Sequence, residues 1–515
     1  MEYRAPITVK DYLEHLAVFG DRKAIIDAET GVGYSYLEVV KKIRAAASVL
    51  ARKIEKGDRV LIYQLEGIEW VISFFAIAGL GGIVVPIDRR ASSEMVRKVL
   101  ELVQPVFILA DIELSFTTKT NLVSFQELIV SHEEEFIFPT ISKDQPIEII
   151  FTSGTWSNPK PVTLSHGNLL SNFEAVLQVY CPPSGSVFLS VLPLSHIYEQ
   201  TIGLLIPLYC GTTIVYLDKI TAKKLVNSLQ KYRVTIMVGV PRILEVLQKS
   251  ILKNIPSARQ RTVFRRIVPV LRRLPVTMRR LLLASLHRKL APTLKTFILA
   301  GAPFPQKLDR FFQGLGFETI VGYGLSETSP CLTISQDQER QELEVGKAIP
   351  GVTVCINGDG EIIARGPNVF LGYWPDLVQK DSFNTQDIGI FDGRENLVLK
   401  GRTKNLVIFP SGDKIFLEEI EHIANGIAGI EESCAFQDGE RLSLLLNTSR
   451  DDLKIIRRDV NHSLPFFARI SNIVPIGRGI DLPRTHTLKI DRRKAWELYL
   501  KSELVAENSK TNSTG

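Results

Sequence analysis

Cysteine is scarce in this chain, and its five residues, at positions 181, 210, 331, 355 and 434, lie far apart in the sequence. No Cys-x-x-Cys pair is present, which argues against a disulfide framework and a zinc site and suits a reducing compartment. The composition is otherwise ordinary for a soluble globular protein, with 45% apolar and 23% charged residues. A chain of 515 residues is too long for one core and predicts roughly two to four structural units.

Long apolar runs are also missing. The longest, residues 70–87, is interrupted by Ser73, three glycines and Pro86, and it is short for a membrane-spanning helix. The N-terminal residues lack the basic-then-apolar order of a secretory signal. We therefore expect a cytoplasmic protein, with a peripheral position on the inner face of the membrane left open.

Acidic residues are absent between Val246 and Leu308, a segment that we call the cationic insert. It holds 14 lysines and arginines, and the rest of the chain has 48 basic against 56 acidic residues. A moderately acidic protein thus carries one strongly cationic segment. Apolar residues separate arginine pairs in this segment, at 265/266, 272/273 and 279/280.

The spacing of these pairs predicts basic amphipathic helical pieces that Pro269 and Pro275 break or kink. Such a stretch, residues 259–289, is typical of an element that contacts an anionic membrane surface. It suits an acidic partner protein or nucleic acid equally well, and a merely solvated helical face is the simplest alternative. Nucleic acid is not expected as a partner, because no recognised nucleic-acid fold accompanies the arginines.

Strands and helices alternate over the first 300 residues, which predicts doubly wound parallel sheets. After about Gln336 the strands become short and are separated by Gly and Asp, which predicts an antiparallel meander or small barrel. From Gly401 a compact α+β unit begins. We therefore expect an α/β fold: a large N-terminal domain of doubly wound sheets plus a small β-barrel, then a small mobile α+β C-terminal domain. The expected strands and helices of the first part include 37–54, 59–63, 69–77, 82–87, 95–103, 106–110, 187–192, 222–231, 235–240 and 297–300.

The most informative segment is IIFTSGTWSNPKPVTLSHGNLL, residues 149–170. It predicts the end of a buried strand followed by a hydroxyl-rich loop, Thr152 to Lys160, with one cation. Backbone N–H groups, hydroxyls and a lysine together can hold phosphate oxygens. The order of a Walker loop is absent, so its mechanics do not apply. Taken alone, an ordinary polar turn explains the loop as well as a phosphate site does.

Further motifs follow in a fixed order, although each alone has a simpler explanation as a turn or a solvated helix start. They are FILAGAPFP at 297–305, VGYGLSETSP at 321–330, TQDIG at 385–389, KGRTKNLVIFPSGDKIFLEEIE at 400–421 and LPRTHTLKIDRRK at 482–494. In this order the chain resembles the acyl-adenylate-forming, or AMP-binding, superfamily over roughly residues 10–500. It is most similar to the long-chain fatty acyl-CoA synthetases, through LPLSHIYEQ at 192–200, VGVPRILE at 238–245 and the basic insert.

The resemblance implies an AMP-forming acid–thiol ligase that uses ATP, magnesium and coenzyme A. A carboxylate attacks the α-phosphate of ATP to give acyl-AMP, and a thiol then displaces AMP. It implies an adenylation domain at 1–403 and a small mobile domain at 405–505, and the polar tail 506–515 is expected to be disordered.

The resemblance also implies roles for particular residues. The catalytic residues would be Lys160, Ser326, Glu327 and the mobile-domain Lys489, and magnesium would be held by Glu327 and Thr152. The nucleotide would be bound by Thr152, Ser153, Gly154, Thr155, Ser157 and Lys160 at the triphosphate, by Gly301, Ala302, Pro303, Tyr323 and Gly324 at the adenine, by Ser326 at the α-phosphate, and by Asp387 and Arg402 at the ribose. Lys404 would be the hinge, and His196 would line the acyl pocket unless it is a satisfied buried histidine.

The chain departs from the family pattern at several glycine positions. Trp156, Ser157 and Pro161 alter the loop, Gln386 replaces a glycine beside Asp387, and Leu417 and Leu488 replace a proline and a glycine. The charged groups all persist, so an active enzyme with altered loop dynamics is favoured over an inactive homologue.

The acceptor thiol and the acid are left open. Coenzyme A is the default, but an acidic acyl carrier protein would also suit the cationic insert. A non-catalytic AMP-binding homologue at a membrane surface is the alternative of another class. Chain length of the acid, oligomeric state and pathway do not follow from the sequence.

Overall fold

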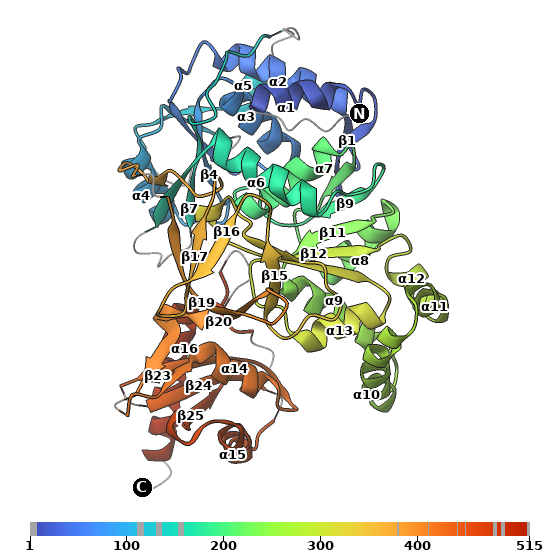
Figure 1. The fold of residues 1–515 in the computed structure, drawn as a ribbon, viewed down its shortest axis with the longest axis vertical. Coiled ribbons are helices and arrows are strands. Elements are labelled where there is room, and N and C mark those ends of the chain that lie inside the picture. The colour runs from blue at the N-terminus through green and yellow to red at the C-terminus, as the bar shows by residue number, and fades with distance from the viewer. Residues whose placement is uncertain are drawn as a thin grey trace. The chain divides into compact units, whose positions relative to one another are not determined.

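The computed structural model describes residues 8–110, 118–129, 136–152, 159–378, 381–409, 411–439, 441–448, 450–476, 481–485 and 490–511. The chain divides into two units (Figure 1). Unit 1 comprises residues 1–355, 363–383 and 392–397, and unit 2 comprises 356–362, 384–391 and 398–515. Two short segments of unit 2, residues 356–362 and 384–391, precede Lys404 in the sequence.

The first sheet of unit 1 has seven strands in the order β18-β8-β7-β4-β3-β5-β6. The five strands from β7 to β6 are parallel, and β8 and β18 add antiparallel neighbours at one edge. Strands β3 and β4 are apolar on both faces because helices cover parallel sheets on both sides. The strands are β3 (Arg59–Tyr63), β4 (Ile83–Ile87), β5 (Phe107–Leu109), β6 (Asn121–Val123), β7 (Pro146–Thr152), β8 (Lys160–Ser165) and β18 (Gly372–Tyr373).

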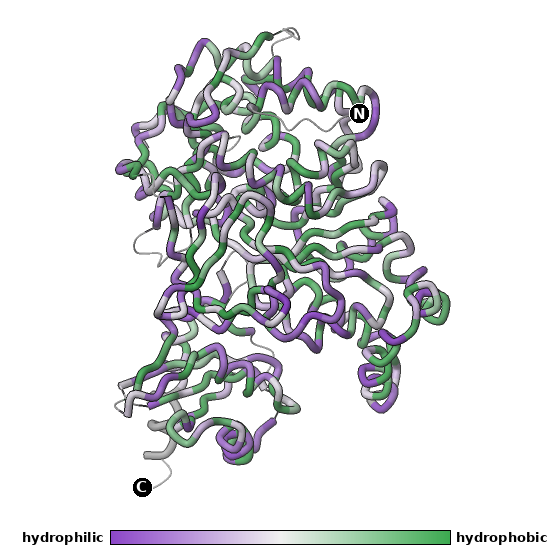
Figure 2. Tube along the Cα trace, viewed as in Figure 1, coloured by the Kyte–Doolittle hydropathy of each residue, from purple (hydrophilic) through white to green (hydrophobic). Residues whose placement is uncertain are grey.

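The second sheet of unit 1 runs in the order β2-β1-β10-β9-β11-β12-β13-β14-β15. Strands β1, β10, β9, β11, β12 and β13 are parallel. Their hydrophobic character is visible along β11 and β12 in Figure 2. The strands are β1 (Lys23–Asp27), β2 (Gly33–Ser35), β9 (Val187–Ser190), β10 (Thr213–Tyr216), β11 (Ile236–Gly239), β12 (Thr296–Leu299), β13 (Glu318–Tyr323), β14 (Thr333–Ser335) and β15 (Glu344–Ala348).

The region after Gln336 has the short antiparallel strands that the sequence predicts. Strand β14 pairs antiparallel with β13 and with β15, so this region is joined to the edge of the second sheet. The four following strands each contain residues of both units: β16 (Thr353–Ile356), β17 (Glu361–Arg365), β19 (Phe383–Phe391) and β20 (Leu397–Arg402).

Helices complete the core between and around the two sheets of unit 1. Tyr12, Phe75, Phe173 and Tyr209 come from four different helices and pack ring against ring in that core. The helices are α1 (Val9–Ala17), α2 (Tyr36–Leu50), α3 (Gly67–Gly79), α4 (Ser93–Val103), α5 (Phe125–Leu128), α6 (His166–Val179), the π-helix η1 (Glu199–Leu205), α7 (Ile206–Tyr209), α8 (Ala222–Lys231), α9 (Pro241–Lys253) and α13 (Gln306–Gly314).

The cationic insert forms helical pieces that break near its prolines, as predicted. They are α10 (Ala258–Ile267), η2 (Val268–Arg273), α11 (Val276–Leu282) and α12 (Ala284–Leu290), which form a projecting edge of unit 1 (Figure 1). Gly314 on α13 lets η2 approach closely, since a Cβ there would lie 2.0 Å from the carbonyl oxygen of Val268.

Three arginines of the insert attach it to the rest of unit 1. Arg272 donates to the carbonyl of Gln338, Arg279 to that of Gln313, and Arg280 to that of Gly316. The arginine pairs therefore do not act as one solvated cationic face, because part of their donors satisfies backbone carbonyls.

Unit 2 contains a three-stranded sheet covered by helices. Strand β24 lies between antiparallel β23 and parallel β25. Helix α16 extends to Thr511, so it runs into the tail that is expected to be disordered, and residues 512–515 lie outside the described residues. The elements are η4 (Thr403–Asn405), β21 (Leu406–Ile408), β22 (Lys414–Phe416), α14 (Leu417–Asn425), β23 (Ile430–Asp438), β24 (Arg441–Thr448), α15 (Leu453–Ser463), η5 (Phe466–Ala468), β25 (Ile470–Pro475) and α16 (Arg492–Thr511).

A buried ion pair fixes α13 beside β13. The Nε of Arg340 lies 2.8 Å from an oxygen of Asp309, and both side chains are almost fully buried. Thr319 and Gln313 also donate to the Asp309 carboxylate. Asp309→Ala leaves the guanidinium buried without its counter-charge, and we expect the free energy of unfolding to fall by about 3–5 kcal/mol. Chemical denaturation followed by circular dichroism measures this loss.

The matched control is Asp337→Ala, which removes the exposed pair with Arg394. Exposed pairs are screened by water, so this variant should lose no more than about 1 kcal/mol. Equal losses in the two variants would contradict the structural role of the buried pair.

Candidate functional site

The loop predicted to hold phosphates joins two neighbouring strands. Thr152 is the last residue of β7 and pairs with Lys160, the first residue of β8. The predicted end of a strand at Thr152 is confirmed, whereas Ser153, Gly154, Thr155, Trp156 and Ser157 lie outside the described residues.

Pro161 fits the start of strand β8. Lys160 is extended, as the following proline predicts. The Pro161 carbonyl accepts a hydrogen bond of 2.9 Å from the N–H of Trp374. The proline therefore keeps its acceptor role in the sheet although it has no N–H to donate.

Three residues from separate segments meet beside this loop. The Nζ of Lys160 lies 5.3 Å from the ring centroid of Tyr373, and the Tyr373 hydroxyl donates to Oε1 of Glu327 at 2.9 Å. Glu327 is buried, with 7% of its surface exposed. Burial, and next the nearby carboxylate of Glu327, raise the pKa of Tyr373 above its usual value. The phenol therefore stays protonated near neutral pH and remains a donor to Glu327.

Tyr373 was not selected from the sequence. A tyrosine in a two-residue strand carries no charge or spacing that separates it from an ordinary core residue. Only its pairing beside β8, where Tyr373 lies opposite Val162, brings its ring to Lys160 and its hydroxyl to Glu327.

Buried asparagines hold the turn that carries Glu327. The side-chain amide of Asn172 donates to the carbonyls of Thr328 and Cys331, at 3.2 and 2.7 Å, and its oxygen accepts from the N–H of Cys331. Asn368 donates to the same two carbonyls. This turn begins with the 3-10 helix η3 (Ser326–Thr328). Side chains satisfy the carbonyls of Thr328 and Cys331, and the backbone N–H of Phe370 donates to the carbonyl of Glu327.

The expected adenine residues follow the carboxyl ends of two adjacent parallel strands. Gly301, Ala302 and Pro303 come after β12, and Tyr323 is the last residue of β13. Gly301 has φ +83°, a left-handed conformation that favours glycine. Ligands of α/β sheets bind at this edge.

Close packing constrains the turn after β13. A Cβ on Gly324 would lie 1.8 Å from the carbonyl oxygen of Pro330. Ser326 then begins η3, next to the buried Glu327. Tyr323 itself is buried, with 9% of its surface exposed. The turn thus places Tyr323, Ser326 and Glu327 at one end of β13, and their roles in nucleotide binding stay predictions.

His196 is partly exposed and lies near a carboxylate. Its Nε2 is 3.8 Å from an oxygen of Asp88, which follows β4. Burial raises the pKa of Asp88, but hydrogen bonds from Arg90 outweigh it, and the net pKa is lowered. Asp88 therefore stays ionised beside the imidazole. His196 is not the fully buried histidine of the simpler alternative, and its place in an acyl pocket stays a prediction.

Within unit 2, the two expected ribose residues contact each other. The Nε of Arg402 lies 2.8 Å from Oδ1 of the buried Asp387. Gln386, which replaces the usual glycine, adopts φ +59°. The backbone therefore keeps a left-handed conformation here at a cost of about 1 kcal/mol, which a glycine would avoid.

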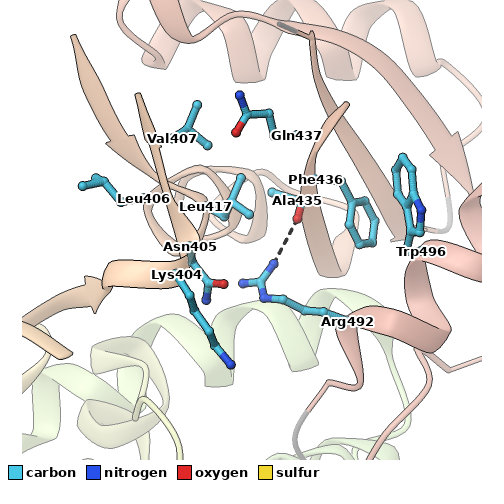
Figure 3. A pocket seen from close by; sticks show the side chains of 10 residues that line it. All are labelled: Lys404, Asn405, Leu406, Val407, Leu417, Ala435, Phe436, Gln437, Arg492 and Trp496. Atoms are coloured by element: carbon cyan, nitrogen blue, oxygen red, sulfur yellow. Dashed lines mark hydrogen bonds between the residues drawn. The ribbon is translucent and has the colours of Figure 1, made fainter. Parts of the chain in front are cut away.

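Lys404 lines a cavity of about 380 Å³ in unit 2 (Figure 3). Burial, followed by the charges of Arg402 and Arg492, lowers the pKa of Lys404. Arg492 donates to the carbonyl of Ala435 and pairs with Glu421 at 2.7 Å, so its charge is already balanced. Lys489 lies outside the described residues.

The AMP-binding enzyme family model matches residues 13–374, about 70% of the chain. The chain belongs to the AMP-binding enzyme family. The long-chain-fatty-acid–CoA ligase FadD15 of Mycobacterium tuberculosis is 27% identical over 428 residues, which cover 73% of this chain and 71% of the ligase. FadD13 of the same species, also named a long-chain-fatty-acid–CoA ligase, is 25% identical over 443 residues, 80% of this chain and 81% of that protein.

Solved structures share the fold. A Mycobacterium tuberculosis fatty acyl CoA synthetase has a TM-score of 0.70 at 21% identity, with 96% of this chain and 98% of that chain covered. ATP-bound MatB from Rhodopseudomonas palustris has a TM-score of 0.77 at 22% identity, with 95% and 99% covered. The expected α/β fold, with a large sheet-rich part and a smaller C-terminal unit, is thereby confirmed.

The described residues contain no group of three or more His, Cys, Asp or Glu side chains arranged to hold a metal ion. In the same part of the chain, no helix is both long and apolar enough to cross a membrane.

The hydrogen bonds that hold the turn of Glu327 can be tested by substituting Asn172 on helix α6. Asn172→Ala leaves the buried N–H of Cys331 without its acceptor and removes one donor from each carbonyl. We expect the free energy of unfolding to fall by about 1–3 kcal/mol, as measured by chemical denaturation. Ser171→Ala on the same helix is the control, since Ser171 bonds only to the local carbonyl of Asn168. A loss as large in the control would show that α6, and not the amide, is responsible.

Proposed function

We propose that the protein activates a fatty carboxylic acid with ATP, forming acyl-AMP, and then transfers the acyl group to the thiol of coenzyme A. The arrangement of Lys160, Tyr373 and Glu327 beside the β7–β8 loop is the observation that supports this most directly. Attack of a carboxylate on a phosphate brings two anions together, so a cation and hydrogen-bond donors at that point lower the barrier.

The two charged residues have different parts in this proposal. Lys160 neutralises phosphate oxygens from the end of β8. Glu327 with Thr152 would hold magnesium together with phosphate oxygens, because magnesium favours one or two carboxylates plus substrate phosphates over an all-protein site. The described residues fit this need, since Glu327 is a buried carboxylate and no protein metal cluster competes with it. Magnesium would supply electrostatic stabilisation of the phosphate charge.

The remaining residues extend the proposed site. Gly301, Ala302, Pro303 and Gly324 would line the adenine and Tyr323 would stack on it, while Ser326 would donate to the α-phosphate. In unit 2, Asp387 would accept from the ribose hydroxyls with Arg402 beside it, Lys404 would be the hinge, and Lys489 would stabilise charge on the reacting carboxylate and α-phosphate. His196 would line the acyl pocket.

A panel of acids tests the reaction. Pyrophosphate release is measured with C2 to C18 acids, with and without coenzyme A. We expect acid-dependent release in the absence of coenzyme A and thioester formation in its presence. If pyrophosphate is released but no coenzyme A thioester forms, the acceptor of the acyl group would be an acyl carrier protein. If the folded protein releases no pyrophosphate in response to any acid, the ligase proposal is refuted and a non-catalytic AMP-binding protein is the remaining alternative.

Tyr373→Phe tests the central arrangement. The variant keeps the ring beside Lys160 but removes the hydroxyl that donates to Glu327. A hydrogen bond to a charged group contributes about 1.5–3 kcal/mol, so we expect kcat for acyl-AMP formation to fall roughly 10- to 100-fold, with a higher magnesium requirement. Pyrophosphate release over a magnesium titration measures both effects.

Tyr232→Phe is the matched control, because it removes a tyrosine hydroxyl that donates to the carbonyl of Ala28, away from this site. Its activity and magnesium requirement should stay unchanged. An unchanged magnesium requirement in Tyr373→Phe would refute the link between this hydroxyl and the Glu327 carboxylate.

We also propose that the cationic insert contacts an anionic membrane surface. Large apolar side chains on it are exposed, with Leu281 at 77% and Leu282 at 64%. Exposed cations of the same insert include Arg265, Arg266, Arg273, Arg288 and Lys289. Apolar side chains next to cations suit the boundary between headgroups and acyl chains.

Binding to vesicles with and without anionic lipid measures this contact. We expect binding to increase with anionic lipid and to weaken with salt, because the attraction is screened. The double variant Leu281→Ser/Leu282→Ser should weaken it severalfold, whereas Leu122→Ser, at an exposed leucine on β6, should not. Binding that does not respond to salt would contradict the proposal.

A further inference from the structure

Two cysteines that are far apart in the sequence lie side by side in unit 1. The Sγ atoms of Cys181 and Cys210 are 3.8 Å apart. Cys181 follows helix α6 and is exposed, and Cys210 directly follows α7 and is partly buried. Both thiols are free. The adenylating activity proposed above does not require these two cysteines.

The separation suits a disulfide that is not yet formed. A disulfide bond is about 2.05 Å long, so the sulfurs must approach each other by somewhat less than 2 Å. Cys181 lies beyond the end of α6, where a side-chain rotation is less constrained than within a helix. Exposure gives a reagent access to Cys181, and Cys210 is positioned to react with whatever Cys181 has become.

We propose that Cys181 and Cys210 form a reversible intramolecular disulfide when the protein meets a low-molecular-weight disulfide. The Cys181 thiolate attacks one sulfur of the reagent, whose S–S bond breaks and releases one thiolate. The Cys210 thiolate then attacks the Cys181 sulfur of this mixed disulfide and releases the second thiolate. The two cysteine protons end on the released thiols, so two cysteine thiols are oxidised and one reagent disulfide is reduced to two thiols.

The two thiols differ in environment, which sets the order of these steps. Burial, followed by the neighbouring Cys181, raises the pKa of the Cys210 thiol. The thiolate is the nucleophile, so exposed Cys181 reacts first and ring closure by Cys210 accelerates as the pH rises.

The crosslink would join the ends of two helices. Helix α6 carries Asn172, whose amide holds the turn of Glu327, and α7 follows the π-helix η1. The bond would close a loop of about 30 residues and restrain these helix ends without consuming Lys160, Tyr373 or Glu327.

The experiment treats the full chain with oxidised glutathione and follows free thiols and the masses of non-reduced peptides. We expect the loss of two thiols, one linked peptide pair containing Cys181 and Cys210, full reversal by a dithiol reductant, and a ring-closure rate that rises up to about tenfold per pH unit between pH 7 and 8. A stable mixed disulfide on Cys181 without ring closure would overturn the proposal, as would a link between other cysteines or between two chains.

Three variants make the result specific. Cys181→Ser should lose both the mixed disulfide and the crosslink. Cys210→Ser should stop at the mixed disulfide on Cys181. Cys355→Ser, at another partly buried thiol, should crosslink at the rate of the unaltered protein. These readouts are independent of ATP and acid, so their failure and a failure of the proposed ligase activity are separate results.

Discussion

The structure around the candidate site depends on satisfying the backbone of one buried turn. Glu327 lies in a turn between β13 and β14, where neighbouring strands do not supply hydrogen bonds. Asn172 and Asn368, which are almost 200 residues apart in sequence, supply them instead. Because unsatisfied buried carbonyls are costly, the position of the carboxylate is coupled to helix α6 and to the segment before β18. The nucleotide chemistry proposed here depends on that coupling.

Satisfaction of backbone carbonyls by side chains also explains how the cationic insert is held in unit 1. A run of arginines without acidic residues suggests a uniformly cationic surface, but Arg272, Arg279 and Arg280 donate to backbone carbonyls of unit 1. Guanidinium groups have five donors in a planar arrangement, so they can serve carbonyls of several segments at once. Other cations of the insert are exposed, as are Leu281 and Leu282, so the surface that faces solvent carries fewer cations than the sequence alone suggests.

Much of the fold could be predicted from patterns that act locally. The strand 59–63 and the helix 222–231 were predicted with the bounds that β3 and α8 have, because short apolar runs and amphipathic periodicity are properties of adjacent residues. The structure places Thr152, Lys160, Tyr323 and Arg402, which the ordered motifs gave as candidate site residues, at the ends of β7, β8, β13 and β20. The pairing of β14 with β13 and β15 did not follow from the sequence, since which neighbour a short strand pairs with depends on the whole sheet.

The sequence by itself determined the family, the alternation of strands and helices, and the charged residues of the candidate site. Only the tertiary structure decided which residues meet across long separations: Tyr373 with Lys160 and Glu327, Asn172 and Asn368 with one turn, and Cys181 with Cys210. The physical reason is that strand pairing and helix packing set these contacts. The residues adjacent to a position in the chain do not specify which distant residue the fold brings into contact with it.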